Sequence, residues 1–516
     1  MAMSNILPQN WLLSRHHFTT LFVLLLVSVT DASDAVGETI GANWPQFRGP
    51  NAQGVSSERG LPVDFGPTTN LLWKTALPPG HSSPCVWGGR LFLTAFKQQK
   101  ELVVLCLDAG DGRIVWEREV PAKRIEKAHP RVGSPASATP ATDGQRVYVF
   151  FGSVGVVCLD FDGRQLWRHE LGPFTHHLGW GAASSPIVCG DSVIVNCDHD
   201  GESFLLALDK QTGSAKWRTP RPQSPPSYST PVLWEAGGQT QLVIAGSAAV
   251  TAYDPATGAE LWRVRQPGSF VATTPVVSAE RLVVAAVDGY AVARDFSSSQ
   301  PAPVKRTPMF DRMFENHDGN RDGKLSREEA PMFSKEIFDR IDTNRDGFLT
   351  REELVADAER QPQAKPSAEP PRKEVGNVLK AIRPGGHGDV TDTHVAWRVP
   401  GQAPYVPSPL AYGDYVYLVK TGGIVSCFEA TTGNQVWKER LGASGDYYAS
   451  PVAGDGKLFL VSEAGKVSVL AAGPKFQLLR EGSLGERCFA TPAIAAGKLY
   501  LRTESNLYCF GQAGRN

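Results

Sequence analysis

Two twelve-residue segments of this 516-residue chain carry oxygen-bearing side chains at the spacing that a hard cation requires. They read DGNRDGKLSREE (318–329) and DTNRDGFLTREE (342–353), and both fit D-x-[DN]-x-[DN]-G-x5-E. Calcium takes about seven oxygen ligands, which such a loop supplies from positions 1, 3, 5, 7, 9 and 12 around a glycine turn. The expected metal ligands are Asp318, Asn320, Asp322, Lys324 (through its carbonyl), Ser326 and Glu329 in the first loop, and Asp342, Asn344, Asp346, Phe348 (through its carbonyl), Thr350 and Glu353 in the second.

The two segments resemble the loops of the EF-hand family. Position 8 is Leu325 in one loop and Leu349 in the other, and this position is apolar in paired loops. The loops start 24 residues apart (318 to 342), so one helix, at about 330–341, fits between them where a standard pair has two. The resemblance implies bound calcium ions, and the alternative is an acidic, solvated loop. For an exported chain, which meets plentiful calcium, we expect a structural role rather than sensing.

The composition around these loops differs from that of the remaining chain. Residues 297–375 hold 30 charged side chains in 79 positions, whereas the other 437 positions hold 75. Proline-rich stretches, SSSQPAPVKRTP (297–308) and QPQAKPSAEPPRK (361–373), bracket the segment and are typical of extended linkers. The segment is therefore expected to be an insertion.

The sequence on both sides of the insertion is a repeat. Each unit is expected to form a strand, a turn that contains glycine, and a second strand that carries tryptophan. The clearest copies are CLDAGDGRIVW (106–116), CLDFDGRQLW (158–167), ALDKQTGSAKW (207–217), AYDPATGAELW (252–262) and CFEATTGNQVW (427–437). The tryptophan column comprises Trp73, Trp116, Trp167, Trp217, Trp262, Trp397 and Trp437. In the seventh unit Phe476 lies near the place where tryptophan is expected.

A second column, Ser or Thr followed by proline, runs in step with the first. Its prolines are Pro84, Pro140, Pro186, Pro231, Pro275, Pro409, Pro451 and Pro492. A period near 45 residues with four strands per unit is typical of a propeller blade, so eight prolines predict eight blades. The one long spacing, 134 residues from Pro275 to Pro409, places the insertion between the second and third strands of blade five. The last unit (499–511) has three strands, and residues 71–73 are expected to complete it.

The predicted fold is therefore all-β: an eight-bladed β-propeller of four-stranded blades, with a small helical EF-hand insertion in blade five. The expected boundaries are 1–35 for a leader, 44–290 for the first part of the propeller, 297–375 for the insertion with its linkers, and 377–511 for the second part.

Residues 1–35 are expected to be a secretory signal peptide. Arg15, His16 and His17 precede a short apolar run (21–29), and small residues follow. The run is short for a membrane span of about 20 residues; an uncleaved anchor is the alternative. We expect the mature protein to be exported to the periplasm or the cell exterior, with no transmembrane span after cleavage.

Charge and cysteine usage narrow the function classes. With 52 Lys and Arg against 53 Asp and Glu, the formal net charge is −1, which argues against nucleic acid as a partner. Of the eight cysteines, Cys106, Cys158, Cys427 and Cys509 share one repeat position that other units fill with alanine, so a small buried side chain is expected there. Cys189 and Cys197 flank a short turn, and either a disulfide or two buried thiols is expected.

The A-x-D-x-x-T-G-x-x-x-W pattern, best seen in 207–217 and 252–262, resembles the pyrroloquinoline quinone (PQQ)-like propeller repeat family. That family includes quinoprotein alcohol dehydrogenases and outer-membrane protein assembly factors, and its tryptophans dock against the neighbouring blade. The resemblance leaves PQQ open as a cofactor. The dehydrogenases resemble one another in an adjacent Cys-Cys pair, an acidic base and calcium ligands in the blades, and none of these is recognisable here.

The connections between blades are expected to meet at one mouth of the propeller. They carry aromatic, histidine and charged side chains suited to holding a ligand or peptide, although aromatics near a propeller axis can also simply pack. The candidate mouth residues are His129, Arg131, His176, His177, Trp180, Asp198, His199, Asp200, Tyr228, Phe270, Tyr405, Tyr447, Tyr448, Arg487 and Phe489. A metal site at Asp198-His199-Asp200 is an unfavoured alternative.

These expectations combine into an exported, calcium-binding propeller that binds a protein or peptide without catalysis. The alternatives are a PQQ-dependent periplasmic oxidoreductase and a component of an outer-membrane or cell-surface assembly. Catalytic residues are not assigned, because no nucleophile, zinc or nucleotide motif occurs in the sequence.

Overall fold

The computed structural model describes residues 43–512 with gaps. Residues 127, 130–131, 177–179, 223, 225, 267–270, 288–313, 361–376 and 443–444 lie outside the description, and the insertion is described at 314, 318, 320, 322–330, 333 and 335–360. The expected signal peptide, both linkers, Arg131, His177 and Phe270 thus lie outside the described residues. No described helix has the length and apolar character to cross a membrane.

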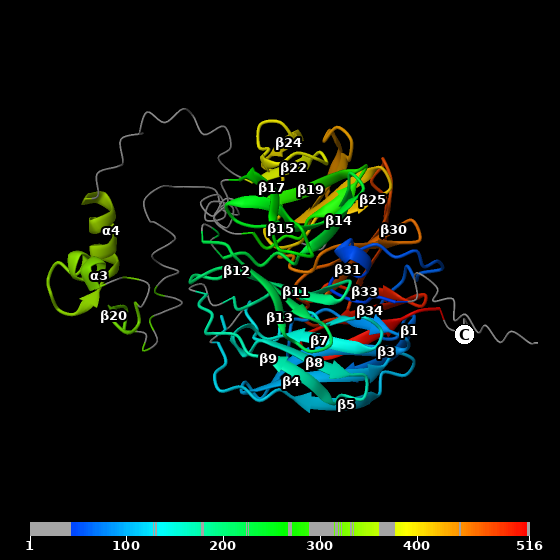
Figure 1. Ribbon diagram of the computed structural model, residues 1–516, viewed down its shortest axis with the longest axis horizontal. Coiled ribbons are helices and arrows are strands. Elements are labelled where there is room, and N and C mark those ends of the chain that lie inside the picture. Colours follow the sequence, from blue (N-terminus) through cyan, green and yellow to red (C-terminus); the bar gives the residue numbers. More distant parts are fainter. Residues whose placement is uncertain are drawn as a thin grey trace, which may run out of the picture. The chain divides into compact units, whose positions relative to one another are not determined.

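Eight antiparallel sheets of four strands form the propeller (Figure 1), which confirms the predicted fold class. Blade one comprises β2 (Cys85–Trp87), β3 (Arg90–Lys97), β4 (Glu101–Asp108) and β5 (Ile114–Glu119), and blade two comprises β6 (Ala141–Thr142), β7 (Arg146–Phe150), β8 (Val156–Asp160) and β9 (Gln165–His169). Blade three comprises β10 (Ile187–Cys189), β11 (Ser192–Cys197), β12 (Phe204–Asp209) and β13 (Ala215–Pro220), and blade four comprises β14 (Val232–Ala236), β15 (Gln239–Ala245), β16 (Ala249–Tyr253) and β17 (Glu260–Arg265). Blade five comprises β18 (Val276–Ser278), β19 (Arg281–Ala286), β22 (Val378–Ile382) and β24 (Val395–Pro400), and blade six comprises β25 (Leu410–Tyr412), β26 (Tyr415–Lys420), β27 (Ile424–Glu429) and β28 (Gln435–Arg440). Blade seven comprises β29 (Val452–Gly454), β30 (Lys457–Val461), β31 (Lys466–Ala471) and β32 (Leu478–Ser483), and blade eight comprises β33 (Ala493–Ala495), β34 (Lys498–Arg502), β35 (Asn506–Phe510) and β1 (Leu71–Ala76).

The inner strands are buried on both faces because each blade packs between two others. In β4 every side chain from Leu102 to Leu107 is buried, whereas the outermost strand β5 is exposed at every position except Val115, Trp116 and Glu117. This burial explains why the inner strands read as continuous apolar runs and the outer strands as mixed ones. The shared cysteine position is buried as expected, for example at Cys106 and Cys158.

The tryptophan column fastens a blade to the next at six junctions, as the resemblance implies, whereas Trp262 Nε1 donates to Gln241 Oε1 within blade four. Trp116 Nε1 donates to the carbonyl of Phe161 in blade two at 2.7 Å, and Trp73 Nε1 donates to the Ala109 carbonyl of blade one at 3.3 Å. The turn of the receiving blade must then carry glycine: Gly112 has φ +75°, and a Cβ there would lie 2.4 Å from the Trp73 ring. This contact is the physical reason for the Gly-and-Trp spacing of the repeat.

Blade seven has no tryptophan in the tryptophan column, and the residue that replaces it is not the predicted Phe476. The pairing that places Trp116 opposite Cys106 in blade one places Arg480 opposite Val469 in blade seven, so Arg480 holds the tryptophan place and Phe476 does not. Phe476 instead packs on Trp437 of blade six, with ring centroids 5.4 Å apart. Blade eight is interrupted at this turn by the chain ends, so there is no hairpin for a tryptophan to cover, and Arg480 pairs with Asp64 at 2.6 Å.

The serine and threonine column forms a hydrogen-bonded ring around the axis. At seven of the eight junctions, the backbone N–H of one residue donates to the hydroxyl of the equivalent residue in the next blade. Ser83 N donates to Thr139 Oγ1 at 2.9 Å, and Thr491 N closes the circle on Ser83 Oγ at 3.0 Å. The remaining junction is Thr230 to Thr274, where the Thr274 hydroxyl has no partner among the described residues. Each ring residue is followed by the proline of its column, which has no backbone N–H that would need a hydrogen-bond acceptor.

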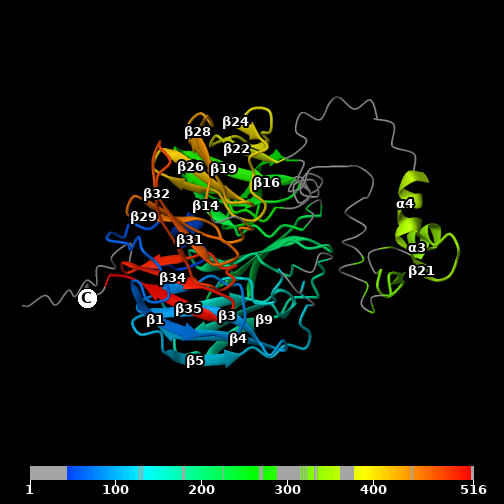
Figure 2. The same ribbon diagram turned by 180° about the vertical axis from the view of Figure 1, so that it is seen from behind.

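The two ends of the propeller sequence close the circle in blade eight. Strand β1 pairs antiparallel with β35, with Leu71 opposite Phe510 and Trp73 opposite Cys509. Figure 1 and Figure 2 show blue β1 beside the red C-terminal strands from both sides. The closure predicted from the unit count is therefore confirmed, and it removes two sheet edges.

Glu486 reinforces this closure from the connection before blade eight. Its carboxylate accepts hydrogen bonds from Tyr508 Oη (2.7 Å), Asn506 Nδ2 (2.8 Å) and Thr503 Oγ1 (2.7 Å), and from Lys74 Nζ of β1 (3.1 Å). Burial alone would raise the pKa of Glu486, but these donors lower it to about 2.

Replacing Glu486 by glutamine is expected to lower the free energy of unfolding by about 1–2 kcal/mol at pH 7, because a charged acceptor of several bonds is lost. A depressed carboxyl pKa stabilises the fold above the ordinary value of 4.5 and loses this effect as the pH falls towards about 2. Chemical denaturation of wild type and E486Q between pH 7 and 3 checks this. A stability difference that stays constant with pH would contradict it.

A segment preceding the repeat crosses the end of the propeller that holds the first hairpin turns, and the sequence did not predict this. Trp44 pairs with Val86 of blade one, and Val55 pairs with Ala453 of blade seven. Gln53 Oε1 accepts from the Val277 N–H of blade five at 2.7 Å. The fully buried Arg48, just before the 3-10 turn η1 (Pro50–Ala52), donates to the Pro409 carbonyl at 2.7 Å. This segment therefore closes one end of the axis and leaves the other as the mouth.

Two further features complete the propeller. Strand β23 (Gly388–Asp389) adds an unpredicted fifth, parallel strand to blade four beside β17, and η2 (Gly152–Val154) lies within blade two.

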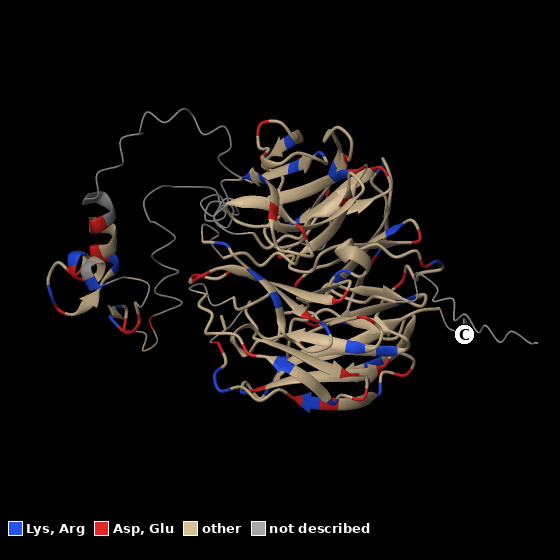
Figure 3. Ribbon diagram, viewed as in Figure 1, with Lys and Arg blue, Asp and Glu red and all other residues tan. Residues whose placement is uncertain are grey.

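All eight cysteines lie among the described residues and are free, so the disulfide alternative for Cys189 and Cys197 is wrong. The hairpin sets Cys189 opposite Ser192, not opposite Cys197. Basic and acidic residues are interspersed along the outer strands and loops (Figure 3).

Candidate functional site

The insertion folds around the two predicted loops. Strands β20 (Leu325–Ser326) and β21 (Phe348–Leu349) pair with Leu325 opposite Leu349, and both leucines are fully buried. Among the described residues one helix, α3 (Lys335–Ile341), lies between the loops, and α4 (Arg351–Arg360) follows the second. Phe314, Phe338, Ile341 and Leu354 complete a small core. The compact, one-helix spacing expected from the sequence is what the structure has.

The first loop turns around Asp318. Its two carboxylate oxygens accept the N–H groups of Asp322 (3.1 Å) and Gly323 (2.8 Å), and Asn320 Oδ1 accepts the N–H of Asp322 at 2.9 Å. Gly323 has φ +80°, the left-handed conformation that the sharp turn needs. The loop therefore directs its side-chain oxygens inward.

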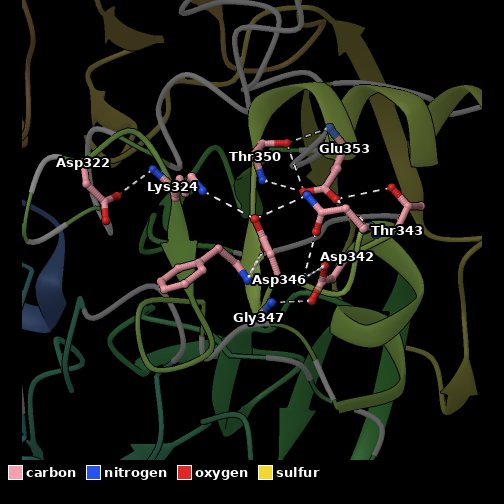
Figure 4. Close-up of polar contacts among 10 residues, drawn as sticks. Asp322, Lys324, Asp342, Thr343, Asp346, Gly347, Thr350 and Glu353 are labelled. Atoms are coloured by element: carbon pink, nitrogen blue, oxygen red, sulfur yellow. Dashed lines mark hydrogen bonds and ion pairs between the residues drawn. The ribbon is translucent and has the colours of Figure 1, made fainter.

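The second loop repeats this arrangement around Asp342 (Figure 4). Its carboxylate accepts the N–H groups of Asp346 (3.1 Å) and Gly347 (3.0 Å). Glu353 joins the two ends of the loop, because Oε1 accepts from Thr343 N at 3.1 Å and Oε2 from Thr350 N at 3.0 Å. Burial alone would raise the pKa of Glu353, but the Thr350 N–H and hydroxyl lower it, so the side chain is a carboxylate at neutral pH.

One ion pair links the two loops. Lys324 Nζ of the first loop lies 3.4 Å from Asp346 Oδ2 of the second, as Figure 4 shows. The Phe348 N–H, with help from Lys324, lowers the pKa of Asp346. Among the described residues, no three His, Cys, Asp or Glu side chains are already gathered as a metal cluster. The donor set fits a hard cation such as calcium, since each loop offers carboxylate, amide and carbonyl oxygens and no sulfur or imidazole.

A cavity of about 480 Å³ lies at the mouth of the propeller. Seven residues of the Ser/Thr ring line it: Ser83, Thr139, Ser185, Thr230, Ser408, Ser450 and Thr491. The position two residues earlier in every unit lines it as well: His81, Ser137, Ala183, Tyr228, Ala272, Val406, Tyr448 and Phe489. The remaining lining residues are Phe47, His129, Val132, Trp180, Tyr405 and Asp446. The repeat itself therefore builds this cavity, and the volume suits a small ligand or a few peptide residues.

Aromatic rings form a continuous arc around the cavity. His81 stacks on Phe489 with centroids 4.3 Å apart, and Phe489 lies 5.2 Å from Tyr448. Trp180 lies 5.9 Å from Tyr405 and 5.5 Å from Tyr228. Burial raises the pKa of Tyr405, and electrostatic interactions with Tyr448 and Tyr228 raise it further. Trp180 precedes blade three and Tyr405 precedes blade six, so their contact reaches across the mouth.

The described lining of the cavity carries little charge, and what it carries is negative. Asp446 is the one acidic residue among the described lining residues, and no described lining residue is Lys or Arg. The Asp446 carboxylate has no hydrogen bond or ion pair with any described residue. Burial lowers the pKa of His81 to about 3, and the charges of Arg502 and Arg487 contribute, so this imidazole is neutral at physiological pH.

The structure brings only some of the predicted mouth residues to the cavity. His129, Trp180, Tyr228, Tyr405, Tyr448 and Phe489 line it. His176 lies behind Tyr228 (5.7 Å), Tyr447 is buried, and Arg487 pairs with Glu463 over the Phe489 ring. The sequence analysis missed Phe47, His81 and Asp446; for His81 the signal was the column two residues before Ser83.

Asp198 and His199 lie away from the cavity lining. Asp198 forms a buried, two-pronged ion pair with Arg221 (Oδ1–Nε 2.8 Å, Oδ2–Nη2 3.1 Å), and Arg221 also donates to the Tyr253 hydroxyl of blade four. Burial raises the pKa of Asp198; burial alone would lower that of Arg221, but the carboxylate raises it. The His199 ring stacks on Phe174 (4.6 Å). These contacts fasten blade three to blade four and speak against a metal site at Asp198-His199-Asp200.

PQQ, a tricarboxylate, does not fit the described lining. An anionic cofactor calls for cationic or amide donors, whereas the charged residue here is Asp446 and His81 is neutral. The acidic calcium loops belong to the insertion, and no adjacent cysteine pair exists in the sequence. No reaction step through a quinone is therefore derived.

Comparisons with known proteins agree with this architecture. The family model described as outer membrane protein assembly factor BamB matches residues 59–226, 206–302 and 421–514, and an EF-hand model matches residues 335–356. The assembly factor BamB of Burkholderia pseudomallei is 33% identical over 99 residues, which are 19% of this chain and 25% of that protein. The chain thus matches about a quarter of the length of this curated relative.

Two solved structures share the fold. BamB from Moraxella catarrhalis superimposes with a TM-score of 0.51 at 13% identity, covering 86% of this chain and 99% of that chain. The computationally designed Ika8 protein gives the same TM-score and coverage at 10% identity. At these identities the likeness concerns the fold alone.

Proposed function

The chain belongs to the family of the outer membrane protein assembly factor BamB, and from this premise we propose that it is an exported, non-catalytic binding propeller. Its mouth holds a segment of a partner protein or a peptide. Calcium ions bind in the inserted EF-hand pair and stabilise that module. The observation that carries the proposal is the cavity itself, lined by aromatic rings and hydroxyls contributed by the repeat.

The composition of the cavity supports binding rather than catalysis. Aromatic side chains present large, rigid surfaces at little cost in conformational entropy, and they dominate protein-binding sites. The ring hydroxyls are held by blade-to-blade bonds, so the lining is preorganised. In the described lining the neutral His81 and the isolated Asp446 have no nucleophile beside them in hydrogen-bond contact.

A structural role for calcium follows from the geometry of the insertion. The loops share one short helix and a two-strand contact, so binding in one loop draws on the same small core as binding in the other. Ligand binding to the folded module alone adds about 2.7 kcal/mol of stability at 100 times the dissociation constant. We expect calcium to hold the module folded rather than to open a groove.

Selection of peptides on the mature, calcium-loaded chain tests the binding proposal. A random peptide library displayed on phage is panned on wild type and counter-panned on the double variant W180A/Y405A, which removes the two rings that meet across the mouth. We expect enriched peptides that bind wild type and are lost on the variant. Peptides that bind both proteins equally, or no enrichment, would contradict a binding mouth.

Family membership favours one form of this function, in which the bound segment belongs to an outer-membrane or cell-surface assembly. Cross-linking from a photoreactive residue at position 405 in cells checks this form. Adducts with an outer-membrane protein that disappear in W180A are expected; adducts restricted to soluble periplasmic chains would contradict it.

A further inference from the structure

We propose that the mouth is an aromatic cage selective for a basic side chain, the lysine or arginine of the bound segment. This inference rests on the proposed peptide-binding function and adds the chemistry of the recognised residue. The juxtaposition that carries it is an arc of aromatic rings beside a carboxylate without a partner in the described structure, in a cavity whose described lining has no positive charge.

The aromatic arc supplies the attraction for a cation. The face of an aromatic ring carries negative electrostatic potential, and ammonium or guanidinium groups within about 6 Å of the ring centroid are attracted to it. Trp180, the best ring for this contact, is set between Tyr228 and Tyr405, at 5.5 and 5.9 Å. Tyr448 and Phe489 continue the surface on the other side. A cation in the cavity would lie beside this row of rings, since Trp180, Tyr228, Tyr405 and Tyr448 all line it.

The charged side chain in the described lining of the mouth has the sign that a cation requires. Asp446 lines the cavity, and its carboxylate has no partner among the described residues. The exposed Asp200 also acts on the cavity, since after burial its charge is the second cause that raises the pKa of Tyr228. Two cations, Arg502 and Arg487, act on His81 of the lining, and Arg487, which lies over the Phe489 ring, is paired with Glu463 at 2.5 Å. Each of the seven ring hydroxyls that line the cavity accepts one blade N–H and keeps a second acceptor site for a charged donor.

The cavity is larger than one side chain. At about 480 Å³ it admits a lysine or arginine together with part of the flanking backbone. This is consistent with a side chain presented by an extended segment of a partner, with the charged end among the rings.

Three peptides that differ at one residue test the inference on the full, calcium-loaded chain. They are Ac-Gly-Ser-X-Ser-Gly-NH2 with X as lysine, norleucine or glutamate, titrated by ligand-observed NMR at low and high salt. We expect the lysine peptide to bind about tenfold tighter than norleucine, from cation–π contacts and the carboxylate. Tight binding of norleucine or glutamate at the mouth would overturn the inference but leave peptide binding standing. No saturable binding by any of the three, together with failed library selection, would overturn both.

Single variants separate the contributions of the aromatic ring, the carboxylate charge and the fold to the affinity for the lysine peptide. Y405L is expected to weaken the lysine peptide about three- to tenfold, and Y405F to weaken it less because the ring remains. D446N is expected to weaken it and to flatten the salt dependence. The control Y412L makes the same change at the opposite end of blade six, away from the cavity lining, and should leave the affinity unchanged. Equal losses in Y405L and Y412L would contradict recognition at the cage.

Discussion

Replacing Asp198 by asparagine is expected to lower the free energy of unfolding of the propeller by about 3–5 kcal/mol, because Arg221 would keep a buried charge without its counterion. The Asp198 side chain is completely buried and that of Arg221 is 3% exposed. The pair joins blade three to Tyr253 of blade four, so its loss weakens a blade interface rather than a loop. Urea denaturation followed by tryptophan fluorescence measures the change.

The control for this prediction is a matched pair on the surface of the same blade. Asp191 and Lys216 lie 2.6 Å apart, but Asp191 is mostly exposed, and D191N should leave the denaturation midpoint nearly unchanged. The double variant D198N/R221M should recover part of the stability lost in D198N, since it removes the orphaned charge. A D198N protein as stable as D191N would show that the buried pair contributes nothing to the fold.

Replacing Glu353 by glutamine is expected to remove strong calcium binding from the second loop. The residue supplies the carboxylate at position 12 and closes the loop through Thr343 and Thr350. Loss of a supporting partner alone typically weakens metal binding roughly 10–100-fold, and loss of a direct charged ligand should exceed this. Calorimetric titration with calcium should fall from about two equivalents in wild type to about one in E353Q.

The neighbouring Glu352 provides the control, because it is an exposed residue in the first turn of the same helix. E352Q should bind calcium with wild-type stoichiometry. Retention of two equivalents and unchanged affinity in E353Q would contradict the assignment of this loop. Loss of both equivalents would indicate that the shared core couples the loops completely.

The sequence predicted those parts of the fold that repeat. The tryptophan and Ser/Thr-Pro columns predicted the blades because each has a physical task in most units: the indole reaches the next blade's turn, and the hydroxyl accepts the N–H of the equivalent residue in the preceding blade. The EF-hand spacing of the insertion was also recognisable, because it lies in the local sequence, and calcium binding by its two loops stays a prediction. Residues 44–65, β23 and Arg480 were missed because each depends on contacts far along the chain, such as Arg48 with Pro409 and Arg480 with Asp64.

The sequence located the mouth, but some of the residues predicted to lie there do not line the cavity. Its connections were located by the repeat, but sequence alone does not tell which way a loop side chain turns. Asp198 was assigned to the mouth because it lies in a connection, yet a bidentate partner 23 residues later, Arg221, holds it buried. His81 was not predicted, although its repeat column, two residues before Ser83, was a usable signal.

The measurement that tests the central claim most directly is a paired calorimetric titration of the calcium-loaded mature chain with PQQ and with the tightest selected peptide. The binding account predicts saturation by the peptide at one equivalent, loss of this binding in W180A/Y405A, and no heat from PQQ. Stoichiometric binding of PQQ that displaces the peptide would contradict it and assign the mouth to a quinone.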